Sequence, residues 1–105
     1  MTVLGDLDMA GAPALRQAVV AEVTGGTRLL VLYLTAVDFL DSAGLGAVVG
    51  GLRRLRAHDG ALMVVCPEPR IRRVFESCDL DRVFVLYPDV GSVIAAAIAA
   101  GERTS

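Results

Sequence analysis

The segment Leu29–Ala57 reads LLVLYLTAVDFLDSAGLGAVVGGLRRLRA and contains the two elements that set the fold. Its first part, Leu29–Leu34, is apolar without alternation, which is typical of a central strand covered by helices on both faces. After the connection Thr35–Asp41, a helix is predicted from Ser42 or Ala43 to about Ala57. Apolar side chains form one stripe at helical spacing along it: Leu45, Val48, Val49, Leu52 and Leu55.

Helices and strands continue to alternate on both sides of this segment. Met1–Leu4 is predicted to be the end of a strand, Ala12–Val23 a helix, and Ala61–Cys66 and Val83–Leu86 two further strands. A helix opened by Pro69 is expected to turn inward Ile71, Val74, Phe75 and Cys78. A last helix, opened by Pro88, is expected to turn inward Val90, Val93, Ile94, Ala97 and Ile98. The order predicts one α/β domain over residues 1–105, with a mixed, mostly parallel sheet of about four strands packed by about four helices.

Composition excludes several classes of protein. The 105 residues are 54% hydrophobic, which rules out intrinsic disorder. The net charge of −2 provides no basic field that would hold nucleic acid or an anionic membrane. All ten basic residues are arginine and His58 is the single histidine, so there is no lysine for a P-loop and no histidine pair for a metal or catalytic centre. We therefore predict no catalytic residue, no metal and no cofactor.

The chain carries no predicted membrane span or signal peptide. No apolar run reaches the ~18–20 residues of a transmembrane helix, and Met1–Gly11 lacks the pattern of a secretory signal. Cys66 and Cys78 are too few for a disulfide framework and are expected to be buried, inert thiols, with a regulatory disulfide between them as the alternative. A cytoplasmic location is expected.

The segment Asp41–Gly46, Asp-Ser-Ala-Gly-Leu-Gly, is the strongest candidate for a functional site. Ser42 is placed to cap the predicted helix, and the helix start favours an anion. A phosphate on Ser42 would add a charge of about −1.5 to −2, which suits a switch. The alternative is a plain structural cap.

Two other arrangements of residues have structural explanations. Gly44, Gly46 and Gly50 follow the spacing G-x-G-x-x-x-G, one residue away from a dinucleotide-binding fingerprint, and are better explained by close packing of the helix against the sheet or against a partner. Asp6 and Asp8 are expected near Asp41, where solvated turn carboxylates are favoured over a catalytic pair.

Several stretches together resemble the bacterial anti-sigma factor antagonists, which carry the STAS (sulfate transporter and anti-sigma antagonist) domain. They are Gly5–Asp8, Leu32–Gly46, Arg70–Glu76 and Leu80–Phe84, and the Asp-Ser-x-Gly-Leu-Gly block is the most specific of them. The resemblance implies that the unphosphorylated protein binds an anti-sigma factor, which is a serine kinase, and thereby frees a sigma factor. It implies that the kinase inactivates the antagonist by phosphorylating it, and that a serine phosphatase resets the switch.

By motif match, the resemblance makes Ser42 the residue expected to be phosphorylated. It places Asp8, Asp41, Ser42, Ala43, Gly44 and Leu45 on the partner-binding surface. Relatives have about one more strand before the Gly5–Asp8 turn, so the first family strand is missing or truncated here. Either upstream residues or a homodimer through the N-terminal edge is expected to fill this place. The alternative function is a STAS accessory subunit of a transporter or a stress-sensing complex.

Overall fold

The computed structural model describes residues 1–80 and 86–104, and it contains four helices and a parallel sheet. The helices are α1 (Ala12–Thr24), α2 (Ser42–Ala57), α3 (Pro69–Ser77) and α4 (Val90–Thr104). The strands are β1 (Leu29–Tyr33), β2 (Ala61–Val65) and β3 (Leu86–Tyr87). The expected α/β alternation is confirmed, with three strands in place of about four. Part of the predicted strand Val83–Leu86 falls in residues 81–85, outside the described residues.

The described sheet has the order β1-β2-β3, and both of its pairings are parallel. Leu29 pairs with Ala61 and Tyr33 with Val65. Each strand is followed by a helix, and α2 carries the chain from β1 back to the start of β2, as parallel neighbours require. The predicted strand Met1–Leu4 is reduced to an isolated parallel bridge between Thr2 and Tyr33.

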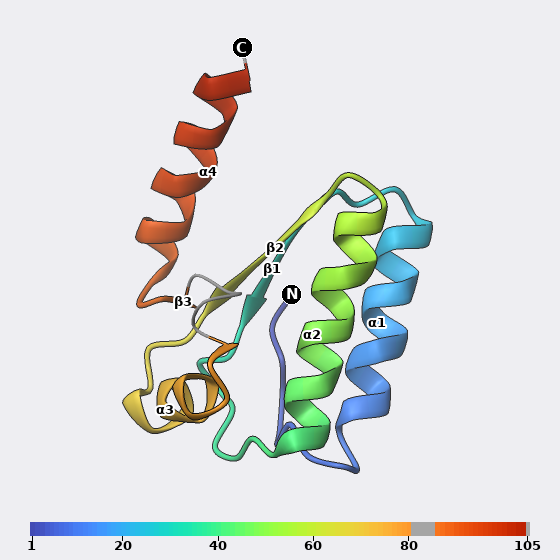
Figure 1. Cartoon of the computed structure of the whole chain (residues 1–105), viewed down its shortest axis with the longest axis vertical. Coiled ribbons are helices and arrows are strands. Elements are labelled where there is room, and N and C mark those ends of the chain that lie inside the picture. Colours follow the sequence, from blue (N-terminus) through green and yellow to red (C-terminus); the bar gives the residue numbers. More distant parts are fainter. Residues whose placement is uncertain (81–85, 105) are drawn as a thin grey trace.

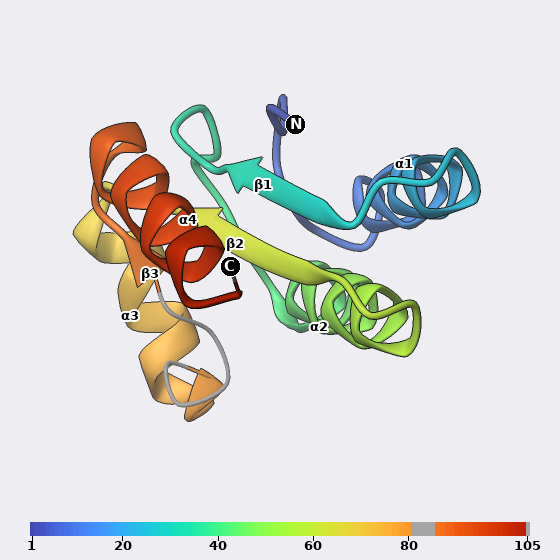
Figure 2. The same cartoon turned by 90° about the horizontal axis from the view of Figure 1, so that it is seen from above.

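The core lies between the sheet and the pair α1 and α2, which run side by side along one face (Figures 1 and 2). The strands alternate there, since Leu30 and Leu32 of β1 are buried whereas Val31 and Tyr33 are half-buried. The other buried side chains on these elements include Leu15, Val19, Val23, Leu45, Val48, Leu52, Leu55, Leu62 and Val64. The predicted stripe of α2 is therefore confirmed as a core face, although Val49 is only half-buried.

Two expectations about the C-terminal half were wrong. Cys78 is exposed, because α3 ends at Ser77 and Cys78 is its C-cap, so its side chain leaves the inner face of the helix. On α4, Val93 is buried, whereas Val90, Ile94 and Ile98 are 43%, 52% and 57% exposed. This helix packs on β2 and the short β3, and its far end extends beyond the sheet (Figure 1), so fewer of its residues reach the core than the stripe predicts.

Candidate functional site

Two loops meet at the N-terminal end of α2 and form the candidate site. Leu7 and Leu40 make an isolated parallel bridge. The Leu7 N–H donates to the Phe39 carbonyl oxygen at 2.9 Å, and the Asp41 N–H donates to the Leu7 carbonyl oxygen at 3.1 Å. The bridge therefore brings the segment after Leu7, with Asp8, alongside the segment that holds Asp41 and Ser42.

Asp41, rather than Ser42, is the N-cap of α2. Its backbone is extended, and its Oδ1 accepts a hydrogen bond from the Gly44 N–H at 3.0 Å, while its carbonyl oxygen accepts from the Leu45 N–H at 2.9 Å. The expectation that Ser42 caps the helix was wrong by one residue. The physical reason is that a carboxylate is as good a cap as a hydroxyl, and the Leu7 bridge holds Asp41 in the extended conformation that a cap requires.

Ser42 therefore does not cap the helix. It is the first residue of α2 and is exposed. Among the described residues, its hydroxyl has no hydrogen-bond partner, and neither do the backbone N–H groups of Ser42 and Ala43. Unpaired N–H groups at a helix start carry partial positive charge and favour a bound or attached anion. The arrangement can therefore hold a phosphate on Ser42 without a rearrangement of the helix.

Asp8 shapes the loop that enters α1. Its Oδ1 accepts hydrogen bonds from the N–H groups of Ala10 and Gly11, at 3.0 and 2.8 Å, and its carbonyl oxygen accepts from the Ala12 N–H at 2.8 Å. The half-buried Asp8 thus closes a turn through its own side chain, while Asp6 is exposed. These contacts support the explanation of Asp8 as a turn carboxylate, and the exposure of Asp6 agrees with a solvated carboxylate.

Gly44 and Leu45, predicted at the partner-binding surface, are both buried. A Cβ added at Gly44 would overlap with the carbonyl group of Leu7. Only glycine therefore lets the first turn of α2 approach the Leu7 backbone so closely. In this structure the two residues position the start of the helix, and the accessible part of the site consists of Ser42 with the half-buried Asp41 and Ala43.

Sequence reasoning missed two large apolar side chains beside the site. Met9 is 79% exposed on the loop after Asp8, and Phe39, in the connection that leads to α2, is 52% exposed. Leu40 is buried, so its neighbour Phe39 points to the opposite side, as successive side chains do in extended backbone. This alternation was readable in the sequence, whereas the exposure of Met9 was not.

Three further properties of residues 1–80 and 86–104 concern metal ligands, thiol reactivity and membrane-spanning helices. These residues contain no group of three histidine, cysteine, aspartate or glutamate side chains that could hold a metal. Burial raises the pKa of the Cys66 thiol to about 11, although the nearby Arg72 acts in the opposite direction, so this cysteine is a poor nucleophile. Within the same ranges, no helix combines the length and hydrophobicity that crossing a bilayer would take.

The chain is similar to known proteins in both its sequence and its structure, and these similarities agree with one another. The profile of the STAS domain matches residues 1–93. An anti-sigma F factor antagonist of Lysinibacillus sphaericus is 33% identical over 69% of this chain and 62% of its own length, which is less than two thirds of that protein. An anti-sigma-B factor antagonist of Staphylococcus aureus is 36% identical over 69% of this chain and 67% of its own. The crystal structure of an anti-sigma factor antagonist from Mycobacterium paratuberculosis superimposes with a TM-score of 0.81 and 38% identity, covering 90% of this chain and 80% of that one.

Proposed function

The chain belongs to the STAS domain family, and from this premise we propose that it is an anti-sigma factor antagonist controlled by phosphorylation of Ser42. In its unphosphorylated form it binds an anti-sigma factor with serine kinase activity and so releases a sigma factor. The kinase transfers phosphate from ATP to Ser42 and the antagonist dissociates, and a serine phosphatase restores the active form. The antagonist names of the relatives support this role, which is one of binding rather than catalysis.

The observation that carries the proposal is the position of Ser42. It is exposed at the first position of α2, while the neighbouring Asp41 provides the cap. A kinase can therefore modify the hydroxyl without removing a contact that the fold needs. Had Ser42 been the cap, phosphorylation would have removed a capping interaction worth about 0.5–2 kcal/mol.

The effect of the phosphate is electrostatic. It adds a charge of about −1.5 to −2 beside the Asp41 carboxylate. The helix start and the free N–H groups of Ser42 and Ala43 stabilise that charge within the chain. A partner surface that packs against a neutral serine would instead have to desolvate a dianion next to a carboxylate. The fold is retained while the affinity for the partner falls.

The residues of the predicted surface divide into two roles. Ser42, Ala43 and the accessible part of Asp41 contact the partner. Asp8, through its turn, and the buried Gly44 and Leu45 hold the two loops and the helix start in place. No contact with nucleic acid or a membrane is part of the proposed function, and the proposed location is the cytoplasm.

The test is phosphorylation followed by binding. The full chain is incubated with ATP and each anti-sigma factor kinase of the source organism, and the modified residue is mapped by mass spectrometry. Phosphate is expected on Ser42 in the wild-type chain and in Ser77→Ala, the matched control, because Ser77 is also an exposed helix serine and its hydroxyl bonds only to the Arg73 carbonyl oxygen at 2.7 Å. No phosphate is expected in Ser42→Ala.

Binding of the Ser42 variants to the same kinase then distinguishes the effect of an added negative charge from the effect of losing the hydroxyl. Ser42→Ala is expected to bind as the unmodified chain does, and Ser42→Asp at least about tenfold more weakly, a difference of about 1.4 kcal/mol. Equal binding of Ser42→Asp and wild type would contradict the switch. Phosphate on another residue, or on none with every kinase, would instead favour an accessory subunit of a transporter or stress-sensing complex.

A further inference from the structure

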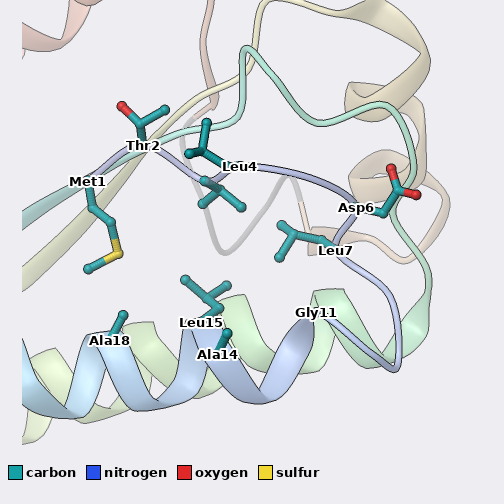
Figure 3. Close-up of a pocket in the computed structure, with 10 residues that line it drawn as sticks. Met1, Thr2, Leu4, Asp6, Leu7, Gly11, Ala14, Leu15 and Ala18 are labelled. Atoms are coloured by element: carbon teal, nitrogen blue, oxygen red, sulfur yellow. The ribbon is translucent and has the colours of Figure 1, made fainter.

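An arginine side chain of α1 reaches across to α2 close to the candidate site. Arg16 lines a groove of about 170 Å³ between the two helices, together with Ala47 and Gly50 of α2. Its guanidinium Nη2 lies 3.9 Å from the point that a Cβ at Gly46 would occupy. The two helices run side by side in the same direction from the end of the molecule that holds Ser42 (Figures 1 and 3). The end of the Arg16 side chain is therefore close to the first turns of α2.

The glycine at position 46 leaves the space between Arg16 and Ser42 open. Ser42 and Gly46 are four residues apart on α2, so their side-chain positions lie on one side of the helix, about 5–6 Å apart. Because helix side chains lean toward the N-terminal end, a side chain at position 46 would lie over the turn that begins with Ser42. Glycine destabilises a helix interior relative to alanine, and packing within the chain does not require it here. The exposed Gly46 instead gives the guanidinium access to Ser42.

Arg16 has no anionic partner in the unmodified chain. Within the described part of the chain, neither a carboxylate nor a carbonyl oxygen pairs with its guanidinium, and the side chain is exposed. The other charged residue of α1, Glu22, accepts a hydrogen bond from the Thr27 hydroxyl at 2.6 Å, and Asp6 points away from α1 (Figure 3). A phosphate suits such an arginine, because the planar guanidinium can donate to two phosphate oxygens at once.

The surroundings of Ser42 are acidic. Asp8 and Asp41 lie on the two segments that meet at the site, and a phosphate on Ser42 adds a charge of about −1.5 to −2 beside them. The two loops of the site, α1 and the first three turns of α2 contain one basic residue, Arg16. An unpaired arginine in this position lowers the electrostatic cost of placing the phosphate there.

We propose that Arg16 binds the phosphate of phosphorylated Ser42 and so links α1 to the start of α2 beside Gly46. The contacts are charge-assisted hydrogen bonds, with N–H···O distances of about 2.7–2.9 Å. Arg16 is a positioning residue for the phosphoryl group, and it stabilises the phosphorylated form of the chain relative to the unphosphorylated form. The inference rests on the proposed function in one respect, namely that Ser42 is the residue that carries the phosphate.

Titration of the phosphate tests this pair without a kinase. Phosphoserine is incorporated at position 42 during synthesis of the full chain, and its phosphorus resonance is followed around the second phosphate pKa of about 6. A guanidinium favours the dianion, so Arg16→Gln is expected to raise this pKa by at least about 0.2. Arg16→Lys is expected to give an intermediate pKa, because lysine keeps the charge but not the planar pair of donors. Asp8 and Asp41 are present in every variant, so they do not account for a difference between them.

The matched control for this titration is Arg54→Gln. Arg54 is exposed and lines the same groove, and its guanidinium also lacks a partner in the described part of the chain. It follows Ser42 by twelve residues on α2, which is about 18 Å along the helix axis. Its loss is expected to change the phosphate pKa by less than about 0.1, because salt screens charges at that separation. An unchanged pKa in Arg16→Gln, or an equal shift in both variants, overturns the proposal.

The urea midpoint of unfolding provides a second measurement. It is determined for the chain with and without phosphoserine at position 42, each with and without Arg16→Gln. The substitution is expected to lower the midpoint of the phosphorylated chain and to change that of the unmodified chain less, because the pair requires the phosphate. Equal changes in both would show that Arg16 acts on the fold alone, and they overturn the proposal.

These results are independent of the kinase experiment. Because phosphoserine is incorporated during synthesis, both measurements can be made whether or not a kinase recognises Ser42. Absence of kinase-dependent phosphate on Ser42 would therefore contradict the proposed function alone, whereas an unchanged phosphate pKa in Arg16→Gln would contradict the pairing alone.

Discussion

Gly44 rests directly on the backbone of Leu7, so closely that a Cβ at position 44 would overlap with the Leu7 carbonyl group. The same carbonyl oxygen accepts a hydrogen bond from the Asp41 N–H at 3.1 Å. One peptide group therefore fixes both the cap and the first turn of α2. Since the turn is held from the side of Leu7, Ser42 is left on the outer side, where it is accessible.

Gly44→Ala is expected to destabilise the fold by about 1–3 kcal/mol, because the added methyl group has no space and the helix must move away from Leu7. Gly50→Ala is the matched control in the same helix. A Cβ at Gly50 meets nothing within 4 Å, so this substitution is expected to stabilise the chain by about 0.5–1 kcal/mol through helix propensity. Urea denaturation measures the free energy of unfolding of both variants. Destabilisation by Gly50→Ala, or none by Gly44→Ala, would contradict the packing argument.

The predicted fold was confirmed where hydrophobic periodicity and burial coincide. The apolar run of β1 and the stripe of α2 gave the correct elements, but the expectation that β1 is covered on both faces was wrong, because Leu29 is exposed and Val31 and Tyr33 are only half-buried. The stripe of α4 predicts an inner face that the structure does not have, since Ile94 and Ile98 remain exposed. Periodicity shows which residues share one side of a helix, but the amount of sheet available to cover that side depends on tertiary packing.

The candidate site was predicted as a segment but not in its details. The sequence indicates a helix start at Asp41–Ser42 and leaves two capping residues side by side. The choice between them depends on the bridge from Leu7 to Leu40, a long-range contact that no local pattern contains. The role of Gly44 could not be predicted for the same reason, because the Leu7 backbone that it contacts is distant in the sequence. Close packing of the helix was the correct interpretation of Gly44, but it was wrong for Gly50, where a Cβ would meet nothing within 4 Å, and for Gly46, where it would meet only the end of the Arg16 side chain.

Two substitutions at Asp41 distinguish the effect of the capping hydrogen bond from the effect of the carboxylate charge. Asp41→Ala is expected to lower the free energy of unfolding by about 0.5–2 kcal/mol, because the Gly44 N–H loses its acceptor. Asp41→Asn keeps an acceptor oxygen and is expected to retain most of that stability, since asparagine caps as well as aspartate. Thermal unfolding followed by circular dichroism measures the difference. If both variants lose the same stability, the carboxylate charge rather than the cap hydrogen bond is responsible.

A negative charge at Ser42 is expected not to harm the fold. Ser42→Glu places a carboxylate in the first turn of α2, where it interacts favourably with the helix dipole by about 0.3–1 kcal/mol, and the nearby Asp41 reduces that gain. The free energy of unfolding should therefore equal or slightly exceed that of Ser42→Gln, the neutral control of the same size. Raising the salt concentration should reduce the difference. A clear loss of stability in Ser42→Glu would mean that the charge disturbs the folded chain itself.

The two cysteines are expected to react at very different rates. Cys78 is exposed at the end of α3, whereas Cys66 is fully buried and its pKa is raised by burial to about 11. A thiol reagent at about pH 8 should modify one thiol of the native chain quickly and the second only in denaturant, because the thiolate is the reactive form. Cys78→Ser should abolish the fast reaction. Fast modification in that variant would show that Cys66 is accessible.

The raised pKa of Cys66 also predicts how stability changes in alkali. In the unfolded chain the thiol has its ordinary pKa of 9.0, so above about pH 9 the unfolded state loses a proton that the folded state keeps until about pH 11. The unfolded state thus binds fewer protons across this window, and the free energy of unfolding must fall as the pH rises through it. Other groups titrate there as well, so the measurement is the difference between wild type and Cys66→Ala in urea titrations from about pH 8 to 11. The stability advantage of the wild-type chain should shrink over this range, and a constant difference would show that the buried thiol does not retain its proton.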